Sequence, residues 1–230
     1  MVMEIIWYGG SCVRMKGRDG VVAADPFKAI VGPTGRGLTA DIVTFGRAET
    51  QSANGKSART AGAVSRHLGV PIPTSLERAF TLDSPGEYEV HGVMVTGVRT
   101  FRDGSRGEER GLSTSFVVEL DGIFTAHLGD IGHLLSQDTL GEMGHIDIAC
   151  LAIGPSLGAS QAAELVAQLD AGLVVPMPTA ADPETAAEDL GRFLREMSVT
   201  DPQPVPKLSA SISTIPKETT VVVLEPRGKS

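Results

Sequence analysis

The chain has 230 residues, of which 41% are hydrophobic and 21% are charged, and its formal net charge is −8. This composition is typical of a soluble globular protein with enough apolar residues for a substantial core. The acidic balance, without any run of Lys and Arg, excludes nucleic acid and membrane surfaces as expected partners, and no apolar run reaches the roughly 20 residues that span a bilayer.

The N-terminal residues predict a strand rather than a signal peptide, because they lack a basic start and a long apolar core. The two cysteines, Cys12 and Cys150, lie in apolar segments, which favours buried free thiols over a disulfide. We therefore expect a cytoplasmic protein.

Short apolar runs separated by turn signals predict β-strands in the first half of the chain. Gly9-Gly10 and Arg18-Asp19-Gly20 are turn sequences typical of hairpins. A polar stretch predicts a loop over 48–60, and a short helix is expected over 61–68. The predicted strands are 4–8, 12–15, 21–24, 42–45, 88–90, 93–100, 113–120 and 123–127.

Helices alternate with strands in the second half of the chain. The predicted helices are 136–143, 160–169 and 183–197, and the predicted strands are 146–153, 173–177 and 219–224. Strands first and alternation later indicate an α/β (α+β) chain with two sheets covered by outer helices, a four-layer αββα sandwich.

Several segments also match the motifs of a known family. Trp7-Tyr8-Gly9-Gly10-Ser11-Cys12 stands where that family has Trp-Tyr-Gly-His-Ser-Cys, and further matches follow in order. They are Ala24-Asp25-Pro26-Phe27, Pro85-Gly86-Glu87-Tyr88-Glu89-Val90, Leu128-Gly129-Asp130-Ile131-Gly132-His133, 204–208 and 222–227. Over nearly its whole length the chain thus resembles the metallo-β-lactamase superfamily, in particular its small Zn-dependent hydrolase branch. The resemblance implies a single metallo-β-lactamase-like domain over residues 1–230.

The resemblance also implies where metal ligands belong. Active members hold two divalent ions, Zn²⁺ or Mn²⁺, with a His-x-His-x-Asp-His loop, two further histidines and an aspartate. Placed on this chain, the loop has Arg47, Glu49, Gln51 and Ser52 at its His, His, Asp and His positions. The sequence has no histidine from 42 to 66.

The two later histidine positions carry Arg102 and Pro178, and only Asp130, the expected bridging carboxylate, is retained. We therefore expect no metal cofactor, unless a Zn or Mn site is rebuilt around Asp130. His127 and His133 flank Asp130 and are expected to bond loop backbone. A single-metal site from Glu49, Asp130 and one histidine is the alternative.

Arg47 and Arg102 are expected to replace the metal ions as partners of Glu49, Asp130 and Asp25, because a buried carboxylate is unstable without a cation. Alternatively, one of these arginines holds a phosphate or carboxylate ligand. The candidate ligand-binding residues of the cleft are Asp25, Arg47, Glu49, Arg102, Asp130 and His133.

The missing ligands predict a non-catalytic scaffold that binds a small anion or a protein partner, without catalytic residues. The resemblance suggests that it forms a homo-oligomer. Two alternatives remain open: a metal-dependent hydrolase with a rebuilt, non-standard metal site, and a structural subunit that partners an active paralogue.

Overall fold

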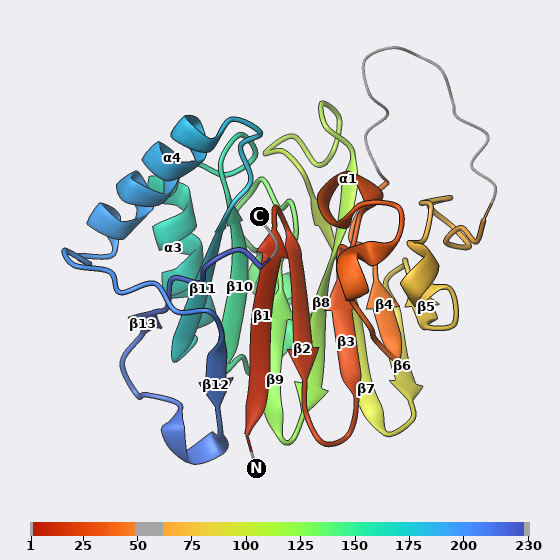
Figure 1. Ribbon diagram of the computed structural model, residues 1–230. Helices are drawn as coiled ribbons and strands as arrows, with labels where there is room; N and C mark the ends of the chain where they lie inside the picture. The colour runs from red at the N-terminus through yellow and green to blue at the C-terminus, as the bar shows by residue number, and fades with distance from the viewer. Residues whose placement is uncertain (1, 49–61, 228–230) are drawn as a thin grey trace.

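The computed structural model describes residues 2–48 and 62–227, and its two β-sheets lie face to face (Figure 1). The first sheet has the order β12-β1-β2-β3-β4-β5 and the second β13-β11-β10-β9-β8-β7-β6. The first comprises β12 (Leu208–Ala210), β1 (Met3–Gly9), β2 (Cys12–Lys16), β3 (Val21–Ala24), β4 (Ile42–Thr44) and β5 (Phe80–Leu82). The second comprises β13 (Thr220–Val221), β11 (Leu173–Pro178), β10 (Ile148–Ile153), β9 (Ile123–His127), β8 (Leu112–Leu120), β7 (Val93–Phe101) and β6 (Gly86–Val90).

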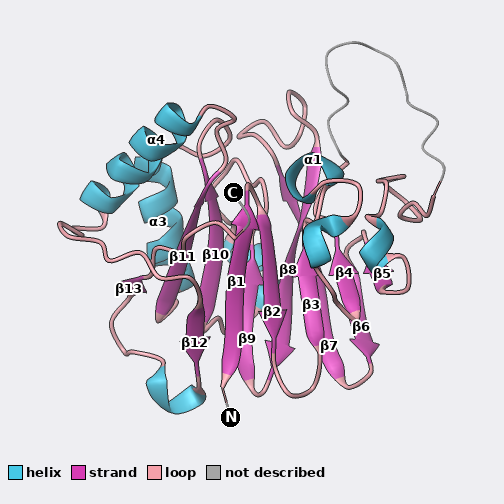
Figure 2. Ribbon diagram, viewed as in Figure 1, coloured by secondary structure: helices cyan, strands magenta, loops and turns pink. Residues whose placement is uncertain are grey.

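Helices cover the outer face of each sheet (Figure 2). The second sheet is covered by α2 (Gln137–Met143), α3 (Ala159–Leu169) and α4 (Pro183–Glu196), and the first by α1 (Lys28–Val31) with short 3-10 turns at Gly35–Gly37 and Thr74–Leu76. The predicted αββα sandwich is confirmed. Within the described residues, none of the helices is both long and apolar enough to cross a bilayer.

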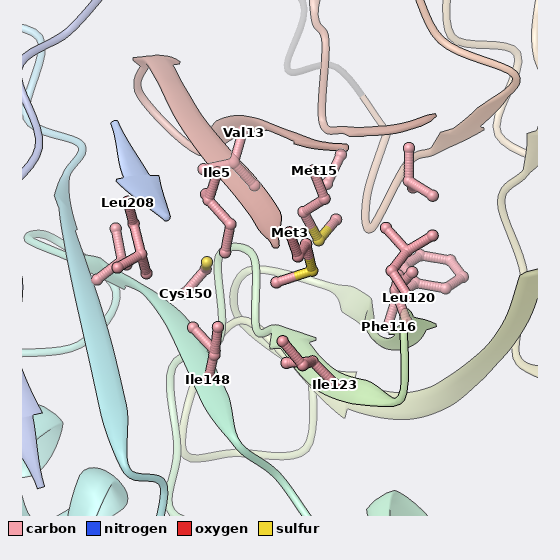
Figure 3. Close-up of a cluster of buried hydrophobic side chains, with 14 of the residues drawn as sticks. Met3, Ile5, Val13, Met15, Phe116, Leu120, Ile123, Ile148, Cys150 and Leu208 are labelled. Atoms are coloured by element: carbon pink, nitrogen blue, oxygen red, sulfur yellow. The ribbon is translucent and has the colours of Figure 1, made fainter. Parts of the chain in front are cut away.

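The main core lies between the two sheets. Met3, Ile5 and Met15 of the first sheet meet Phe116 and Ile148 of the second, and all five are fully buried (Figure 3). β8 is buried on both faces, because residues 116 and 118 point to this core while 117 packs under the helices. A strand covered on both faces is expected to read as a continuous apolar run, as 116–118 does.

Both cysteines are confirmed as buried free thiols. Desolvation raises the pKa of Cys150 to about 12. Desolvation, with a smaller contribution from the Asp25 charge, raises the pKa of Cys12 well above its ordinary value.

We expect neither thiol of the native protein to react with Ellman's reagent at about pH 8, because only the thiolate attacks and both pKa values lie higher. Unfolding in guanidinium chloride should expose both to stoichiometric labelling. Rapid labelling of the native protein would contradict the buried, protonated state.

The helix predicted over 61–68 is wrong for the residues that are described. Residues 62–68 contain no helical turn of this kind: a turn at 66–68 is enclosed by an antiparallel bridge between Val64 and Pro71. The backbone N–H groups of His67 and Leu68 donate to Asp83 Oδ2 at 2.7 and 3.1 Å, so that they are not available for helical bonds. The loop predicted over 48–60 lies, from residue 49 onward, outside the described residues.

The strand directions determine which residues meet at one edge of the sandwich. β3 is parallel to β4, and β9, β10 and β11 are parallel to one another. The carboxyl ends of parallel strands lie at the same edge of a sheet. Across this edge the two sheets are joined, because Gly46 O accepts the backbone N–H of Thr114 at 2.7 Å and the hydroxyl of Ser113 at 3.2 Å.

Candidate functional site

A pocket of about 570 Å³ opens at this edge, a volume typical of small-molecule sites. Its wall combines the β1–β2 turn, the α1 region, the segment after β4, the β7–β8 connection and the loops after β9, β10 and β11. The lining residues are Tyr8, Gly9, Gly10, Ser11, Ala29, Ile30, Arg36, Arg47, Arg110, Asp130, Pro155, Ser156, Thr179, Ala180 and Ala181.

Asp130 lies at the centre of the polar contacts of this pocket. Its Oδ2 accepts from Arg102 Nε at 2.9 Å and lies 2.8 Å from Arg102 Nη2. Arg47 Nε is 3.4 Å from the same oxygen, and Ser156 donates its hydroxyl to Oδ1. Two guanidinium groups therefore neutralise a carboxylate whose side chain is only 13% exposed.

The two arginines reach Asp130 from different sheets. Arg47 follows β4 of the first sheet, and its guanidinium carbon lies 4.5 Å from the centre of the Phe27 ring, in a cation–π contact. Arg102 follows β7 of the second sheet, and its Nη1 donates to Arg110 O at 2.8 Å. The sequence-based expectation of ion pairs with Glu49, Asp130 and Asp25 therefore holds for Asp130, whereas Glu49 lies outside the described residues and Asp25 forms no ion pair within them.

Arg110 stands on a turn that Asp103 organises. Desolvation opposes ionisation of Asp103, but four backbone N–H groups, those of Arg110, Gly107, Ser105 and Glu109, together lower its pKa. The shortest of these bonds is from Arg110 N to Oδ2, at 2.6 Å. The ionised carboxylate thus fixes the backbone that carries Arg110, whose Nη1 donates to Pro155 O at 2.6 Å.

Asp25 lies beneath the pocket rather than in its wall. It is fully buried, and its Oδ1 accepts the backbone N–H of Gly46 at 2.8 Å. Its Oδ2, the hydroxyl of Ser11 and His127 Nδ1 are buried without a hydrogen-bond partner among the described residues. Asp25 therefore supports the strand end that carries Arg47.

The histidines that flank Asp130 bond backbone, as expected. His133 Nε2 accepts the N–H of Phe101 at 3.0 Å, and its Nδ1 lies 2.6 Å from Leu134 O, so both ring nitrogens are occupied. His127 Nε2 lies 2.7 Å from Ser11 O in the buried interior. The structure does not place His133 in the pocket, although the sequence grouped it with the cleft residues.

Glu49, Gln51 and Ser52 lie outside the described residues. Of the predicted cleft residues, the structure brings together Arg47, Arg102 and Asp130. Sequence reasoning missed Arg110, Ser156 and Thr179. Ser156 and Thr179 could have been predicted from their positions after the strands β10 and β11, because the carboxyl ends of these parallel strands meet at the edge where Asp130 lies.

Residues 4–178 match the family model described as the beta-lactamase superfamily domain. The chain belongs to this superfamily. One similar solved structure is that of a protein of the metallo-β-lactamase superfamily from Thermotoga maritima, assigned as a Zn-dependent hydrolase. It is 28% identical in sequence to this chain, with a TM-score of 0.69, and the match covers 96% of this chain and 98% of that one.

Two curated relatives carry the name UPF0173 metal-dependent hydrolase. The protein from Methanoregula boonei is 28% identical in an alignment of 188 residues that covers 76% of this chain and 81% of that protein. The protein from Thermococcus onnurineus is 38% identical in an alignment of 109 residues that covers 43% of this chain and 49% of that protein. The latter match thus spans about half the length of the relative.

These relatives correct two predictions made from the sequence. The prediction of a non-catalytic scaffold is wrong, because the relatives and the Thermotoga structure are named as hydrolases. The prediction of no metal cofactor is wrong for a related reason, because the names of these proteins state a metal or zinc dependence. The replacement of the family's histidines shows that the metal ligands differ in this chain. It does not by itself show that the activity has been lost.

The described residues nevertheless do not fit the two-ion centre of the family. Within residues 2–48 and 62–227, no three His, Cys, Asp or Glu side chains are grouped so that they could hold a metal ion. Both oxygens of Asp130 are engaged, and two guanidinium groups beside it would repel a divalent cation. Pro178, at one histidine position of the family, offers no side-chain donor.

Proposed function

We propose that the protein is a metal-dependent hydrolase with a non-standard metal site, and that its substrate binds in the pocket beside Asp130. Family membership and the names of the relatives support the reaction class. The location of the substrate site is supported by the Arg102–Asp130–Arg47 cluster, which joins the two sheets at the edge of the pocket.

The chain's own residues supply electrostatic complementarity for hydrolysis. Hydrolysis of an ester or a phosphoester develops negative charge on a substrate oxygen. A guanidinium group beside the pocket stabilises such charge through fixed, charge-assisted hydrogen bonds. Asp130 orients the Arg102 and Arg47 side chains, and Ser156 orients the carboxylate.

The experiment is a turnover screen with chromogenic carboxylic esters, phosphate mono- and diesters and a β-lactam, in the presence of Zn²⁺ or Mn²⁺ and after treatment with a chelator. We expect turnover of at least one class that the chelator abolishes and the metal restores. Asp130→Asn should lower kcat/KM about 100-fold, as expected for the loss of an electrostatic group at the reacting centre.

The matched control is Asp201→Asn, because Asp201 is exposed in the loop after α4 and, among the described residues, accepts only from Gln203 at 3.1 Å. It should retain full turnover. Absence of turnover in every substrate class with either metal, or equal rates for Asp130→Asn and the wild type, would refute the proposed function.

A further inference from the structure

We propose that the pocket recognises a phosphate group on the substrate, held by the guanidinium groups of Arg47 and Arg110. This inference rests on the proposed function, because it names the substrate class of that hydrolase. It goes further in predicting which part of the substrate meets which side chain.

The charge of the described pocket wall favours an anionic ligand. Arg36, Arg47 and Arg110 line the wall, and Asp130 is the carboxylate among its described lining residues. Arg102, behind the wall, already bonds this carboxylate with two of its nitrogens. The chain as a whole carries a net charge of −8, so this concentration of positive charge is opposite in sign to the rest of the molecule.

A chain of short contacts connects Arg47 and Arg110 through Asp130, Ser156 and Pro155. Arg47 Nε lies 3.4 Å from Asp130 Oδ2, and Oδ1 of the same carboxylate accepts from Ser156. The residue before Ser156, Pro155, accepts from Arg110 Nη1 at 2.6 Å. The two guanidinium groups therefore border the same small part of the pocket.

Both guanidinium groups keep donors for a ligand. Arg110 makes its one side-chain hydrogen bond within the described chain through Nη1. Arg47 donates Nη1 to Ala48 O at 3.2 Å, and its buried Nε faces Asp130 Oδ2 at 3.4 Å, so its remaining donors are on Nη1 and Nη2. An arginine carries five N–H donors, so each group has several left.

A buried hydroxyl also belongs to a residue of the pocket wall. Ser11 lines the pocket, is only 3% exposed, and its buried Oγ has no hydrogen-bond partner among the described residues. A buried hydroxyl without a partner is unfavourable, so a ligand oxygen at this position would stabilise it. The donors come from the β1–β2 turn, the segment after β4 and the β7–β8 connection. Donors from three directions suit the tetrahedral oxygens of a phosphate better than the two coplanar oxygens of a carboxylate.

The test is calorimetric titration of inorganic phosphate, and separately of acetate, into the wild type, Arg110→Gln and Arg192→Gln. Arg110→Gln should weaken phosphate binding about tenfold or more, the effect of losing one charge-assisted hydrogen bond. Arg192→Gln is the matched control, because Arg192 lies on α4, is 54% exposed and pairs with Glu188 and Asp189. It should bind phosphate like the wild type.

The inference is overturned if the wild type does not saturate at millimolar phosphate, if Arg110→Gln binds as well as the wild type, or if acetate binds as tightly as phosphate. A kinetic arm separates this result from the proposed function. With p-nitrophenyl phosphate, Arg110→Gln should raise KM about tenfold, whereas KM for the uncharged p-nitrophenyl acetate should not change. Turnover of uncharged esters without phosphate binding refutes only this inference, whereas phosphate binding without any turnover supports it and counts against the proposed function.

Discussion

Replacing Arg102 by alanine is expected to lower the free energy of unfolding by about 3 kcal/mol, the effect of breaking a largely buried ion pair from one side. The Arg102 side chain is 14% exposed and makes two contacts to Asp130 Oδ2, at 2.8 and 2.9 Å. Its loss leaves Asp130 with Arg47 at 3.4 Å and with Ser156. Urea unfolding at constant pH and ionic strength measures the change.

A double-mutant cycle identifies the cause. Arg102→Ala combined with Asp130→Ala should be less destabilising than the sum of the two single changes, because the partner charge is removed as well. The exposed pair of Arg192 and Glu188 on α4 is the control, and breaking it should change stability by less than about 0.5 kcal/mol. Additive effects at Arg102 and Asp130 would show that the pair is not coupled.

Replacing Gly132 by alanine is expected to destabilise the protein by about 3 kcal/mol, at the upper end of the range for overpacking. A Cβ at this position would meet the carbonyl group of Arg102 and lie 2.7 Å from the backbone nitrogen of Asp103. Gly132 N also donates to Phe101 O at 2.9 Å, which holds the loop after β9 against the end of β7. Because the obstacle is backbone, no side-chain rotation relieves it.

Gly141, within α2, is the matched control for Gly132. A Cβ there has no neighbour within 4 Å, so Gly141→Ala should stabilise the protein by about 0.5–1 kcal/mol through helix propensity. Thermal or urea unfolding of both variants measures the difference. A Gly132→Ala variant as stable as the wild type would mean that the loop after β9 can move away from β7 without loss.

The sequence was sufficient for the central strands and for both edges of the second sheet, and insufficient for the two edges of the first sheet. Runs such as 113–120 and 146–153 are apolar and bounded by turn signals, so their strands were predictable. The edge strands β5 and β12 have three residues each and carry no periodicity of their own. Their pairing depends on neighbours that are distant in the sequence, which a local pattern does not encode.

The same limit applies to the pocket. Arg47, Arg102 and Asp130 were found because they occupy motif positions of a family, whereas Arg110 stands on a turn without a motif. His133 shares the motif of Asp130, yet its ring turns to the backbone of Phe101 and Leu134. Spacing along the chain showed which residues lie near the pocket, but it did not show which way their side chains point.

The pairing of β1 with β12 has a consequence for synthesis of the chain. Met3 pairs with Ala210, and Lys207 forms an ion pair with Glu4, so β1 receives one of its neighbours only after all the residues that lie between the two strands have been made (Figure 1). At about 5–20 residues per second, the outer edge of β1 remains without this partner for roughly 10–40 s. During that interval the nascent chain presents an open strand edge, and we expect chaperone dependence to be greatest then.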